Sequence, residues 1–390
     1  MKKKKTPTRL PKIILVGGGH AHALFLLYWS KLSEKPAAVT LISLSDYAPY
    51  SGMLPGLVAG HFGHDETHID LRELCRHAGA TFIQGRADAV DPSRQQVMMS
   101  NDTSLNYDIL SINAGAGPNL ATTGADNLTI PVKPISDFYQ VWMELLSQIQ
   151  TPKQFNAPLS IAVVGGGASG VELIQAMHHR LQREAASGAS YNLSLVQRGR
   201  GQPENYPKGL QQKFATRLAR QGIAVHEKFS VNRVEKNTES SLLHASDGRK
   251  LAANYIIWCT QAIGAPWLKR TQLPLDGDGF IEIEDTLQAV GHPLIFACGD
   301  CASMVNHKIP KAGVYAVRQA ETLTHNILAL LNKESLRVFK PQRSYLSIVT
   351  GGDQWALAAR GGLSLPICSP RLVWQWKRHI DKRFMAQFQF

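Results

Sequence analysis

The chain has 390 residues, of which 44% are hydrophobic and 18% are charged, a composition that predicts two or three globular domains. No apolar run reaches the roughly 18 residues that a membrane-spanning helix needs, and the basic start Met1–Lys5 leads into a glycine turn rather than a cleavage site for a secretory signal. The five cysteines fit a reducing compartment, so we expect a cytoplasmic protein. The net charge of +12 suits an anionic cofactor, an anionic lipid surface or nucleic acid, and charge alone does not choose among them.

The first motif is a glycine turn between a predicted strand and a predicted helix. The apolar run Lys12–Val16 ends at Gly17, Gly18 and Gly19, and apolar residues at helical spacing resume with His20 and Ala21. Such a turn lets backbone N–H groups approach a pyrophosphate, whose charge is favoured by the N-terminal end of the helix. His22 replaces the third glycine of the fingerprint. The rings of His20 and His22 either touch a flavin or cap the turn, and we favour capping because it needs no special geometry.

The segment after this helix predicts a second parallel strand and a functional loop. The strand Ala38–Ser43 ends at Ser43, where an acidic residue would normally bond an adenosine ribose. The loop Tyr47–Gly56 contains Ser51 and Gly52 and is rich in Pro and Gly. It is too apolar for a simple linker, and we therefore expect it to line a site.

Three histidines, His61, His64 and His68, lie close together beyond this loop. Imidazoles beside carboxylates are good metal ligands. The sequence shows no second set of residues that would orient them, so we interpret them as solvated polar side chains and predict no metal.

Further elements are expected before the middle of the chain: a helix over Asp70–His77, strands within Thr81–Asp91 and Gln96–Met99, a helix over Ile135–Ile149 and a polar linker over Thr151–Pro158. Between them, a buried strand that starts near Tyr107 runs into a glycine turn at Ala114 and Gly115. This repeats the strand-to-glycine pattern of the first motif.

A second glycine cradle follows the strand Leu159–Val164. Gly165, Gly167 and Gly170 stand in full GxGxxG register, with Ala168 and Ser169 between them and a helix over Val171 to about Ala186. Two cradles in one chain predict two bound dinucleotides.

The strand Asn192–Gln197 then ends at Gln197, where an acidic residue would favour NAD. Arg198 and Arg200 follow it, and either could accept a 2′-phosphate, so NADH and NADPH both stay open. A helix over Leu210–Gln221 and short strands around Ala224 and Leu242 come next, and a strand over Leu251–Thr260 leads to a turn at Gly264.

The stretch Pro293–Ala302 predicts a buried strand that delivers Gly299 and Asp300 into a turn, where the carboxylate can bond a sugar hydroxyl. Cys298 and Cys301 flank this turn as a C-x-x-C pair. The pair is either a redox couple or two small buried residues, and we favour the second interpretation.

A long helix is expected from Lys308 to about Leu331. Its start contains Lys311, Ala312 and Gly313, and the positive end of the helix can face an electron-rich ring.

The tail predicts a hairpin and a basic amphipathic helix. Strand-like runs over Tyr345–Val349 and Trp355–Ala359 flank Gly351-Gly352-Asp353. Beyond Pro370, an apolar stripe recurs at helical spacing beside basic residues; its members are Val373, Trp376, Ile380 and Phe384. Such a helix either lies in an anionic membrane surface or packs on its own domain.

The order of these motifs resembles that of flavoproteins with two dinucleotide-binding domains, the pyridine nucleotide-disulfide oxidoreductase superfamily. The loop Tyr50–Gly56, the helix start at Pro310 and the short tail resemble its type II NADH dehydrogenase-like branch. More narrowly, Val16–Ala23, Tyr50–Gly56, Pro310–Gly313 and Gly351–Asp353 resemble flavoproteins found fused to or beside selenide, water dikinase.

The resemblance implies an α/β fold with two Rossmann-like domains and a small C-terminal α+β segment. An FAD domain would comprise residues 1–125 and 276–332, interrupted by an inserted NAD(P)H domain over 126–275, with the C-terminal segment over 333–390.

The resemblance also implies which residues bind the cofactors. FAD would contact Gly17, Gly18, Gly19, His20, Ala21, Ser43, Ser51, Gly52, Ala87, Ala114, Gly115, Gly299, Asp300, Lys311, Ala312 and Gly313. NADH or NADPH would contact Gly165, Gly167, Ala168, Ser169, Gly170, Gln197, Arg198 and Gly264. Glu172 is the candidate catalytic residue, which orients the nicotinamide or helps to move protons; otherwise it is a first-turn carboxylate favoured by the helix dipole.

The electron acceptor is the open question. Type II dehydrogenases place two glutamines at the quinone site on the helix after the Asp turn, whereas this chain has Val314 and Arg318 there, and Gln319 beside them. We expect a quinone acceptor and peripheral docking on the inner membrane face through the basic tail. A soluble reductase for another carrier or a selenium-related substrate, and a slow redox-sensing partner protein, are the alternatives. A homodimer is possible on this reading, and the dispersed cations predict no nucleic-acid binding.

Overall fold

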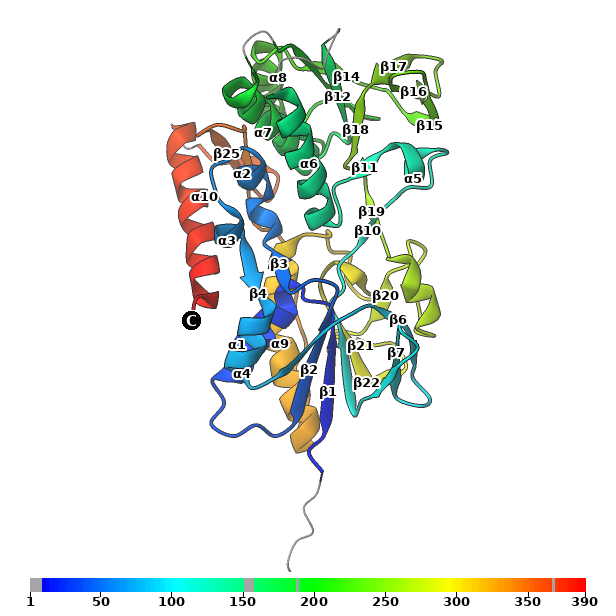
Figure 1. The fold of residues 1–390 in the computed structure, drawn as a ribbon. Coiled ribbons are helices and arrows are strands. Elements are labelled where there is room, and N and C mark those ends of the chain that lie inside the picture. The colour runs from blue at the N-terminus through cyan, green and yellow to red at the C-terminus, as the bar shows by residue number, and fades with distance from the viewer. Residues whose placement is uncertain (1–8, 151–157, 187–188, 367–368) are drawn as a thin grey trace, which may run out of the picture.

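The computed structural model describes residues 9–150, 158–186, 189–366 and 369–390. Two α/β bodies lie one above the other in Figure 1, and a C-terminal helix runs along their flank. The linker predicted over residues 151–158 falls, except for Pro158, outside the described residues. No helix in the described ranges is long and apolar enough to cross a membrane.

The first body is built on an eight-stranded sheet with the order β23-β20-β21-β22-β9-β1-β2-β5. Its strands are β1 (Lys12–Val16), β2 (Ala38–Ser43), β5 (Thr81–Gln84), β9 (Ile109–Ile112), β20 (Ile281–Ile283), β21 (Gln288–Ala289), β22 (His292–Ala297) and β23 (Ala302–Met304). The run β22-β9-β1-β2-β5 is parallel throughout. Because β22 comes from far along the chain, this body is discontinuous in sequence, as expected.

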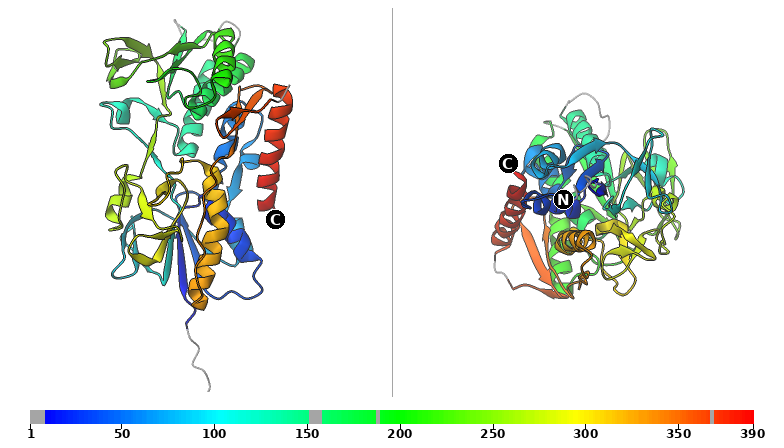
Figure 2. Two further views of the ribbon diagram at one scale, coloured as in Figure 1. Left: turned by 180° about the vertical axis from the view of Figure 1, so that it is seen from behind. Right: turned by 90° about the horizontal axis from the view of Figure 1, so that it is seen from below.

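Helices cover the parallel part of this sheet. They are α1 (His20–Ser30), α4 (Leu71–Ala78) and α9 (Gly313–Asn332), and α9 runs along the back of the body in Figure 2. Fully buried side chains such as Ile13, Phe25 and Trp29 fill the core between sheet and helices, which supplies the main hydrophobic stabilisation of the body. A small antiparallel sheet of β6 (Ala87–Asp91), β7 (Gln96–Met99) and β8 (Ser104–Asn106) lies beside it.

The second body is built on a five-stranded parallel sheet with the order β11-β18-β12-β13-β14. Its elements are β11 (Ile130–Pro131), β12 (Leu159–Val164), β13 (Tyr191–Val196), β14 (Ala224–His226), β18 (Tyr255–Trp258), α6 (Ile135–Ile149), α7 (Ala168–Glu184) and α8 (Lys208–Arg220). An antiparallel sheet of β15 (Val231–Lys236), β16 (Ser241–Ala245) and β17 (Lys250–Ala253), together with α5 (Ala125–Leu128), completes it.

The chain passes between the bodies along two paired segments. β10 (Gly117–Pro118) and β19 (Ala262–Ile263) run antiparallel between the bodies. The observed architecture confirms the expected fold class, two Rossmann-like α/β units with the second inserted into the first.

The C-terminal segment forms a hairpin and a helix. Its elements are β24 (Leu346–Thr350), β25 (Ala356–Arg360), β26 (Leu363–Ser364), α10 (Pro370–Met385) and the single 3-10 turn η4 (Ala386–Phe388). The hairpin confirms the Gly351–Asp353 turn signal, and α10 packs against the hairpin and lies beside α2 and α3 (Figures 1 and 2).

Three local predictions need correction. The stretch Tyr47–Gly56 is not a loop but contains β3 (Tyr47–Pro49), the 3-10 turn η1 (Ser51–Met53) and the start of α2 (Leu54–Val58), and β3 pairs with β4 (His68–Asp70), which follows α3 (His64–Thr67). The predicted strand Leu251–Thr260 is two strands, β17 and β18, that belong to different sheets. The helix expected from Lys308 begins at Gly313.

Candidate functional site

The first glycine cradle is a tight turn with no room for side chains. Gly17 has φ +96°, and a Cβ built on it would lie 2.5 Å from the carbonyl oxygen of Asn113. A Cβ on Gly19 would lie 2.2 Å from Asn113 Oδ1. No side chain caps α1, so the N–H groups of its first turn are left for a ligand at this end of the helix.

Several predicted residues gather at the same edge of the eight-stranded sheet. Gly17 follows β1, Gly115 follows β9, and Gly299 follows β22, three neighbouring parallel strands whose carboxyl ends meet here. Asn113 ties them together, because its side-chain amide donates to the Cys298 carbonyl at 2.7 Å. Carboxyl ends of parallel strands are the usual place for ligands in such sheets.

His20 and His22 have different roles in this turn. His22 is fully buried, and its ring bonds the Gly17 carbonyl at 2.7 Å and Ser111 Oγ at 2.8 Å, which confirms the capping interpretation for this residue. His20 instead has a buried Nε2 without a hydrogen-bond partner among the described residues. Burial lowers the pKa of both imidazoles to about 4, so both rings are neutral at physiological pH.

Asp300 forms an ion pair that the sequence did not indicate. Lys133, between β11 and α6 of the second body, has its Nζ 2.8 Å from Asp300 Oδ2. The pair joins the two bodies at the turn where the resemblance implies a sugar hydroxyl, and it leaves Asp300 Oδ1 available.

The start of α9 faces the η1 turn. A Cβ on Gly313 would lie 3.6 Å from Ser51 Oγ, so Ser51 and Gly52 adjoin the positive end of this helix. Lys311 donates to the Ala302 carbonyl at 2.6 Å and lies 3.7 Å from the centre of the Phe280 ring. Burial lowers the pKa of the Lys311 ammonium.

The second cradle repeats the geometry of the first. Gly165 has φ +134°, and a Cβ on it would lie 2.1 Å from the Cys259 carbonyl oxygen. A Cβ on Gly170 would lie 2.0 Å from the carbonyl oxygen of Gly165, so only glycine lets α7 approach the turn this closely. No side chain caps α7 at Gly167.

The end of β13 carries an amide between charged neighbours. Gln197 is buried, its Nε2 lies 3.4 Å from Glu227 Oε1, and its Oε1 has no partner within the described residues. Arg198 is exposed and lines the adjoining hollow together with Glu204. Both charge signs are therefore present where the adenosine ribose is expected.

Glu172 lies just beyond the first turn of α7 and accepts hydrogen bonds from the C-terminal hairpin. Its Oε1 accepts from the Thr350 N–H at 2.8 Å and from the Thr350 hydroxyl at 3.1 Å. Burial raises the pKa of the Glu172 carboxyl, and this effect outweighs Lys377 and the two Thr350 donors, which lower it. A carboxyl with a raised pKa in such a place is a candidate proton-handling group.

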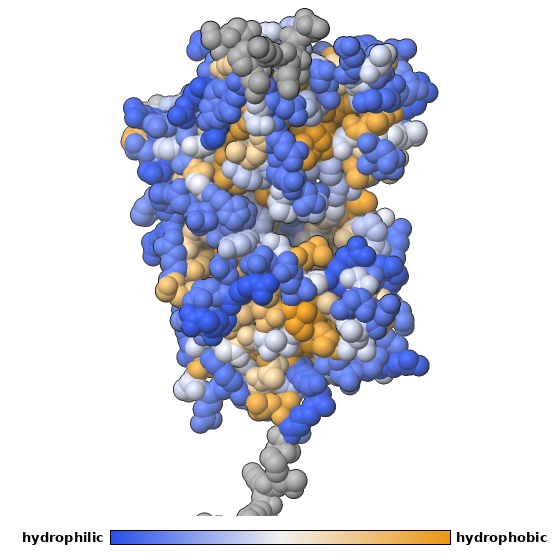
Figure 3. All heavy atoms as spheres, viewed as in Figure 1, coloured by the Kyte–Doolittle hydropathy of each residue, from blue (hydrophilic) through white to orange (hydrophobic). Residues whose placement is uncertain are grey.

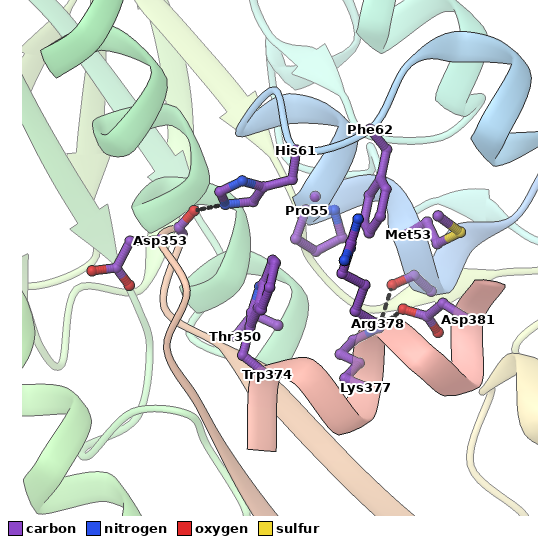
Figure 4. Close-up of a pocket in the computed structure, with 13 residues that line it drawn as sticks. Met53, Pro55, His61, Phe62, Thr350, Asp353, Trp374, Lys377, Arg378 and Asp381 are labelled. Atoms are coloured by element: carbon purple, nitrogen blue, oxygen red, sulfur yellow. Dashed lines mark hydrogen bonds and ion pairs between the residues drawn. The ribbon is translucent and has the colours of Figure 1, made fainter. Parts of the chain in front are cut away.

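Two separate hollows adjoin these residues. The larger lies between the bodies and is lined by Gly165–Gly170, Arg198 and residues 303–311. The face in Figure 3 is mostly hydrophilic at its outer edges, with apolar residues gathered towards its middle. The smaller hollow lies under α10 (Figure 4) and is lined by Gly52, Thr350 and Lys377, among others.

Charged groups of α10 reach into the small hollow. Lys377 donates to the Gly52 carbonyl at 2.7 Å and pairs with Asp381 Oδ2 at 2.7 Å, and Asp381 is almost fully buried (Figure 4). Burial raises the pKa of the Tyr50 hydroxyl, which bonds Asp381 and so ties the helix to the same turn. Phe384 stacks on the Tyr50 ring at 4.6 Å.

Other predicted residues lie elsewhere. Ser43 Oγ faces Gly18, where a Cβ would lie 3.2 Å away, so Ser43 adjoins the first glycine cradle. Ala87 opens β6, and Gly264 contacts the Gly279 backbone; neither is among the described residues that line the large hollow. Gln319 is buried, and its side-chain oxygen accepts a hydrogen bond from the Gly299 N–H at 2.7 Å. This oxygen is therefore already engaged within the protein.

The histidine and cysteine motifs have structural surroundings. His61 is partly buried and bonds the Gly352 carbonyl at 2.8 Å, while the rings of His64 and His68 stack at 3.8 Å, so the histidines are not simply solvated. No group of three potential ligands that could hold a metal occurs among the described residues. Cys298 and Cys301 are fully buried, and burial raises the pKa of both thiols, that of Cys301 to about 11, which opposes a thiolate redox couple.

The sequence analysis missed Asn113, Lys133, Thr350, Lys377 and Asp381 as site residues. Only Asn113 carries a local signal, since it directly follows a buried strand and precedes Gly115. The others lie 167 residues or more from the partners that bring them to the site.

The fold and the two cradles define a protein that binds two dinucleotides. Residues 11–320 match the family described as pyridine nucleotide-disulphide oxidoreductase, and the chain belongs to this family.

Three individual relatives each share a quarter or less of their aligned residues with this chain. A demethylphylloquinone reductase, NdbB, of Synechocystis sp. is 25% identical over 375 residues, which cover 92% of this chain and 89% of that protein. A type II NADH:quinone oxidoreductase of Haemophilus influenzae is 24% identical, covering 85% of this chain and 83% of the relative. The solved structure of NDH2 from Plasmodium falciparum in complex with NADH superposes with a TM-score of 0.81 at 18% identity, covering 97% of this chain and 98% of the other.

Proposed function

We propose that this chain is an FAD-dependent NAD(P)H:quinone oxidoreductase. The observation that carries the proposal is the pair of glycine cradles, each at the carboxyl edge of its own parallel sheet, in a chain whose full-length relatives include quinone reductases. When bound, FAD would accept a hydride from NAD(P)H and pass the electrons on to the quinone.

The residues of the first body fit FAD. The turn at Gly17 and Gly19 has no space for a Cβ, so a pyrophosphate can approach the backbone N–H groups of uncapped α1. His20 offers an unpartnered buried nitrogen, and Asp300 offers an oxygen for a ribityl hydroxyl. The positive end of α9, with Lys311 beside it, would favour negative charge on the flavin ring.

The residues of the second body fit NAD(P)H. Gly165, Gly167 and Gly170 would take its pyrophosphate, and Gln197 or Arg198 its adenosine ribose. The nicotinamide would enter through the large hollow, which Gly165–Gly170 line, and Glu172, two residues further along α7, would orient it or hold a proton.

We propose that the quinone, the electron acceptor, enters at the small hollow under α10. It shares no lining residue with the large hollow, so the nucleotide and the quinone would approach from different directions. Phe62 and Trp374 offer flat apolar surfaces for a quinone ring, and Lys377 offers a hydrogen-bond donor for its oxygen (Figure 4).

Anaerobic stopped-flow tests the function directly. The purified yellow protein is mixed with NADH or NADPH, and the reduced protein is then mixed with ubiquinone or menaquinone analogues. We expect loss of the flavin band at about 10 s⁻¹ or faster with one nucleotide, and comparably fast recovery with quinone. Fast reduction with slow recovery would favour another carrier or a selenium-related substrate. Absence of bound flavin, or no reduction by either nucleotide, would contradict the proposal.

We also propose that α10 docks on an anionic membrane surface. Its exposed face differs from the predicted stripe, because Val373 is buried against the hairpin and Phe384 packs on Tyr50. The apolar residues left exposed are Leu372 (59%), Trp376 (40%) and Ile380 (38%). At about 100° per residue these three share one side of the helix, and Arg371, Arg378 and Lys382 lie on another exposed side, an arrangement suited to lipid and headgroups.

Replacing Leu372, Trp376 and Ile380 together with alanine is expected to weaken binding to vesicles more than tenfold, because each side chain contributes buried apolar area at the interface. Co-sedimentation with vesicles that contain phosphatidylglycerol, at low salt, measures the effect. Met143→Ala on α6 is the matched control, since this side chain is also 40% exposed but lies on the second body. Equal partitioning of the triple variant and the wild type would refute docking through α10.

A further inference from the structure

The turn between β24 and β25 is pressed against the helix that carries Glu172. Gly352 has φ +87°, and a Cβ on it would lie 2.0 Å from the Gln175 carbonyl oxygen of α7. The Gly351 N–H donates to the Trp355 carbonyl at 2.8 Å and closes the turn. Only glycine fits at position 352, so the hairpin and α7 have one closely defined separation.

Two side chains from other elements hold this turn in place. Arg217 of α8 forms an ion pair with Asp353 Oδ1 at 2.5 Å, donates to the Gly351 carbonyl at 3.3 Å and lies 4.6 Å from the centre of the Trp355 ring. His61 also bonds the Gly352 carbonyl, at 2.8 Å (Figure 4). The Arg217 side chain is only 19% exposed, so solvent competes weakly for these contacts.

Thr350 is the residue through which the turn reaches the redox site. It immediately precedes the turn, and both its N–H and its hydroxyl donate to one oxygen of Glu172, at 2.8 and 3.1 Å. Two donors on one carboxylate oxygen fix the rotamer of the side chain and favour its charged form.

We propose that Thr350 is a positioning residue for Glu172, and that the clamped turn Gly351–Asp353 holds Thr350 in the geometry that sets the orientation and protonation of this carboxyl. The inference rests on the proposed function, in which Glu172 acts beside the nicotinamide. The sequence indicates this turn only as a hairpin signal. On this inference the turn also contributes to the reaction.

Several charged groups surround the Glu172 carboxyl. Lys377 and Asp381 face it from α10, with opposite effects on its pKa, and the Tyr206 hydroxyl and the Cys259 thiol lie close enough to feel its charge. Burial is the largest influence and raises the Glu172 pKa. Removal of the Thr350 hydroxyl takes away one donor that lowers this pKa, so the pKa must rise further, while the backbone donor stays.

The test compares Thr350→Val, Thr350→Ser and Glu172→Gln in the FAD-loaded full chain. The pH dependence of anaerobic flavin reduction by the preferred nucleotide is one readout, and infrared titration of the carboxyl band that disappears in Glu172→Gln is the other. We expect the Glu172 inflection to move to higher pH in Thr350→Val, with reduction at neutral pH slowed roughly three- to tenfold, and to return to the wild-type position in Thr350→Ser.

Arg217→Lys keeps the charge of the clamp but loses its forked geometry, and we expect a smaller shift in the same direction. It also tests the inference should Thr350→Val fail to bind FAD. A pH inflection that survives in Glu172→Gln would overturn the assigned role of Glu172, and the inference with it. An inflection that disappears in Glu172→Gln but stays unmoved in Thr350→Val and Arg217→Lys would overturn the inference alone.

Discussion

Gly17→Ala is expected to yield a folded protein that retains less than a tenth of the bound FAD of the wild type. Gly17 has φ +96°, a region that costs an alanine about 1 kcal/mol or more, and the new Cβ would lie 2.5 Å from the Asn113 carbonyl oxygen. Relief of this clash would move the turn away from β9 and spread the N–H groups that bind the pyrophosphate. The ratio of flavin absorbance to protein absorbance after gel filtration measures the loss.

Gly63→Ala is the matched control for this change. Gly63 has φ −81° and nothing within 4 Å of its Cβ position, so it should retain full flavin occupancy. Full occupancy in Gly17→Ala as well would show that FAD does not lie against this turn.

Gly170→Val is expected to separate the two nucleotide sites. A Cβ at position 170 would lie 2.0 Å from the Gly165 carbonyl oxygen, so α7 must move away from the cradle that it supports. The first glycine cradle does not take part in this contact, and we expect normal FAD content but flavin reduction by NADH and NADPH slowed at least 100-fold. Stopped-flow reduction over a range of nucleotide concentrations distinguishes lost affinity from lost rate.

The control for this variant is Gly209→Ala in α8. Nothing lies within 4 Å of its Cβ position, and alanine favours a helix over glycine. Reduction of Gly170→Val at the wild-type rate would exclude this cradle as the NAD(P)H site.

Both cradles could be predicted from sequence because their signals are local. A strand, a glycine turn and a helix follow one another within a short stretch at Gly17 and again at Gly165, and backbone sterics dictate the turn. The parallel strands β1 and β12 also have their predicted bounds, since short apolar runs flanked by glycine leave few alternatives.

Contacts between remote segments explain what the sequence did not indicate. The stretch Leu251–Thr260 reads as one strand, but Asn254 donates to the Ser160 carbonyl at 2.9 Å and accepts from the Ser160 N–H at 2.8 Å, which turns the chain from one sheet into another. Tyr50 likewise donates its N–H to Thr67, so the predicted loop becomes part of a folded unit. The spacing of apolar residues along the sequence does not indicate that Ser160 and Thr67 are the partners.

The acceptor side was the least predictable part of the site. Lys377 reaches Gly52 across 325 residues of sequence, and Thr350 reaches Glu172 across 178. Helical spacing alone placed Phe384 with Trp376 on one face of α10, whereas packing on Tyr50 buries much of the first and leaves the second exposed. An amphipathic pattern shows that a helix has an apolar side but not which protein surface covers it.

The contacts that tie the C-terminal segment to the two bodies come late in the chain, and this sets the order of events during synthesis. Every residue of both cradles has been made by Gln319, whereas Thr350 and Lys377, which tie the C-terminal segment to the second and the first body, follow it. Domains generally fold as units while the ribosome is still adding residues. The nascent protein therefore passes through a stage in which both nucleotide sites exist, but Glu172 lacks its Thr350 donors and the small hollow lacks the wall that α10 supplies. The acceptor side is completed only when the last helix docks.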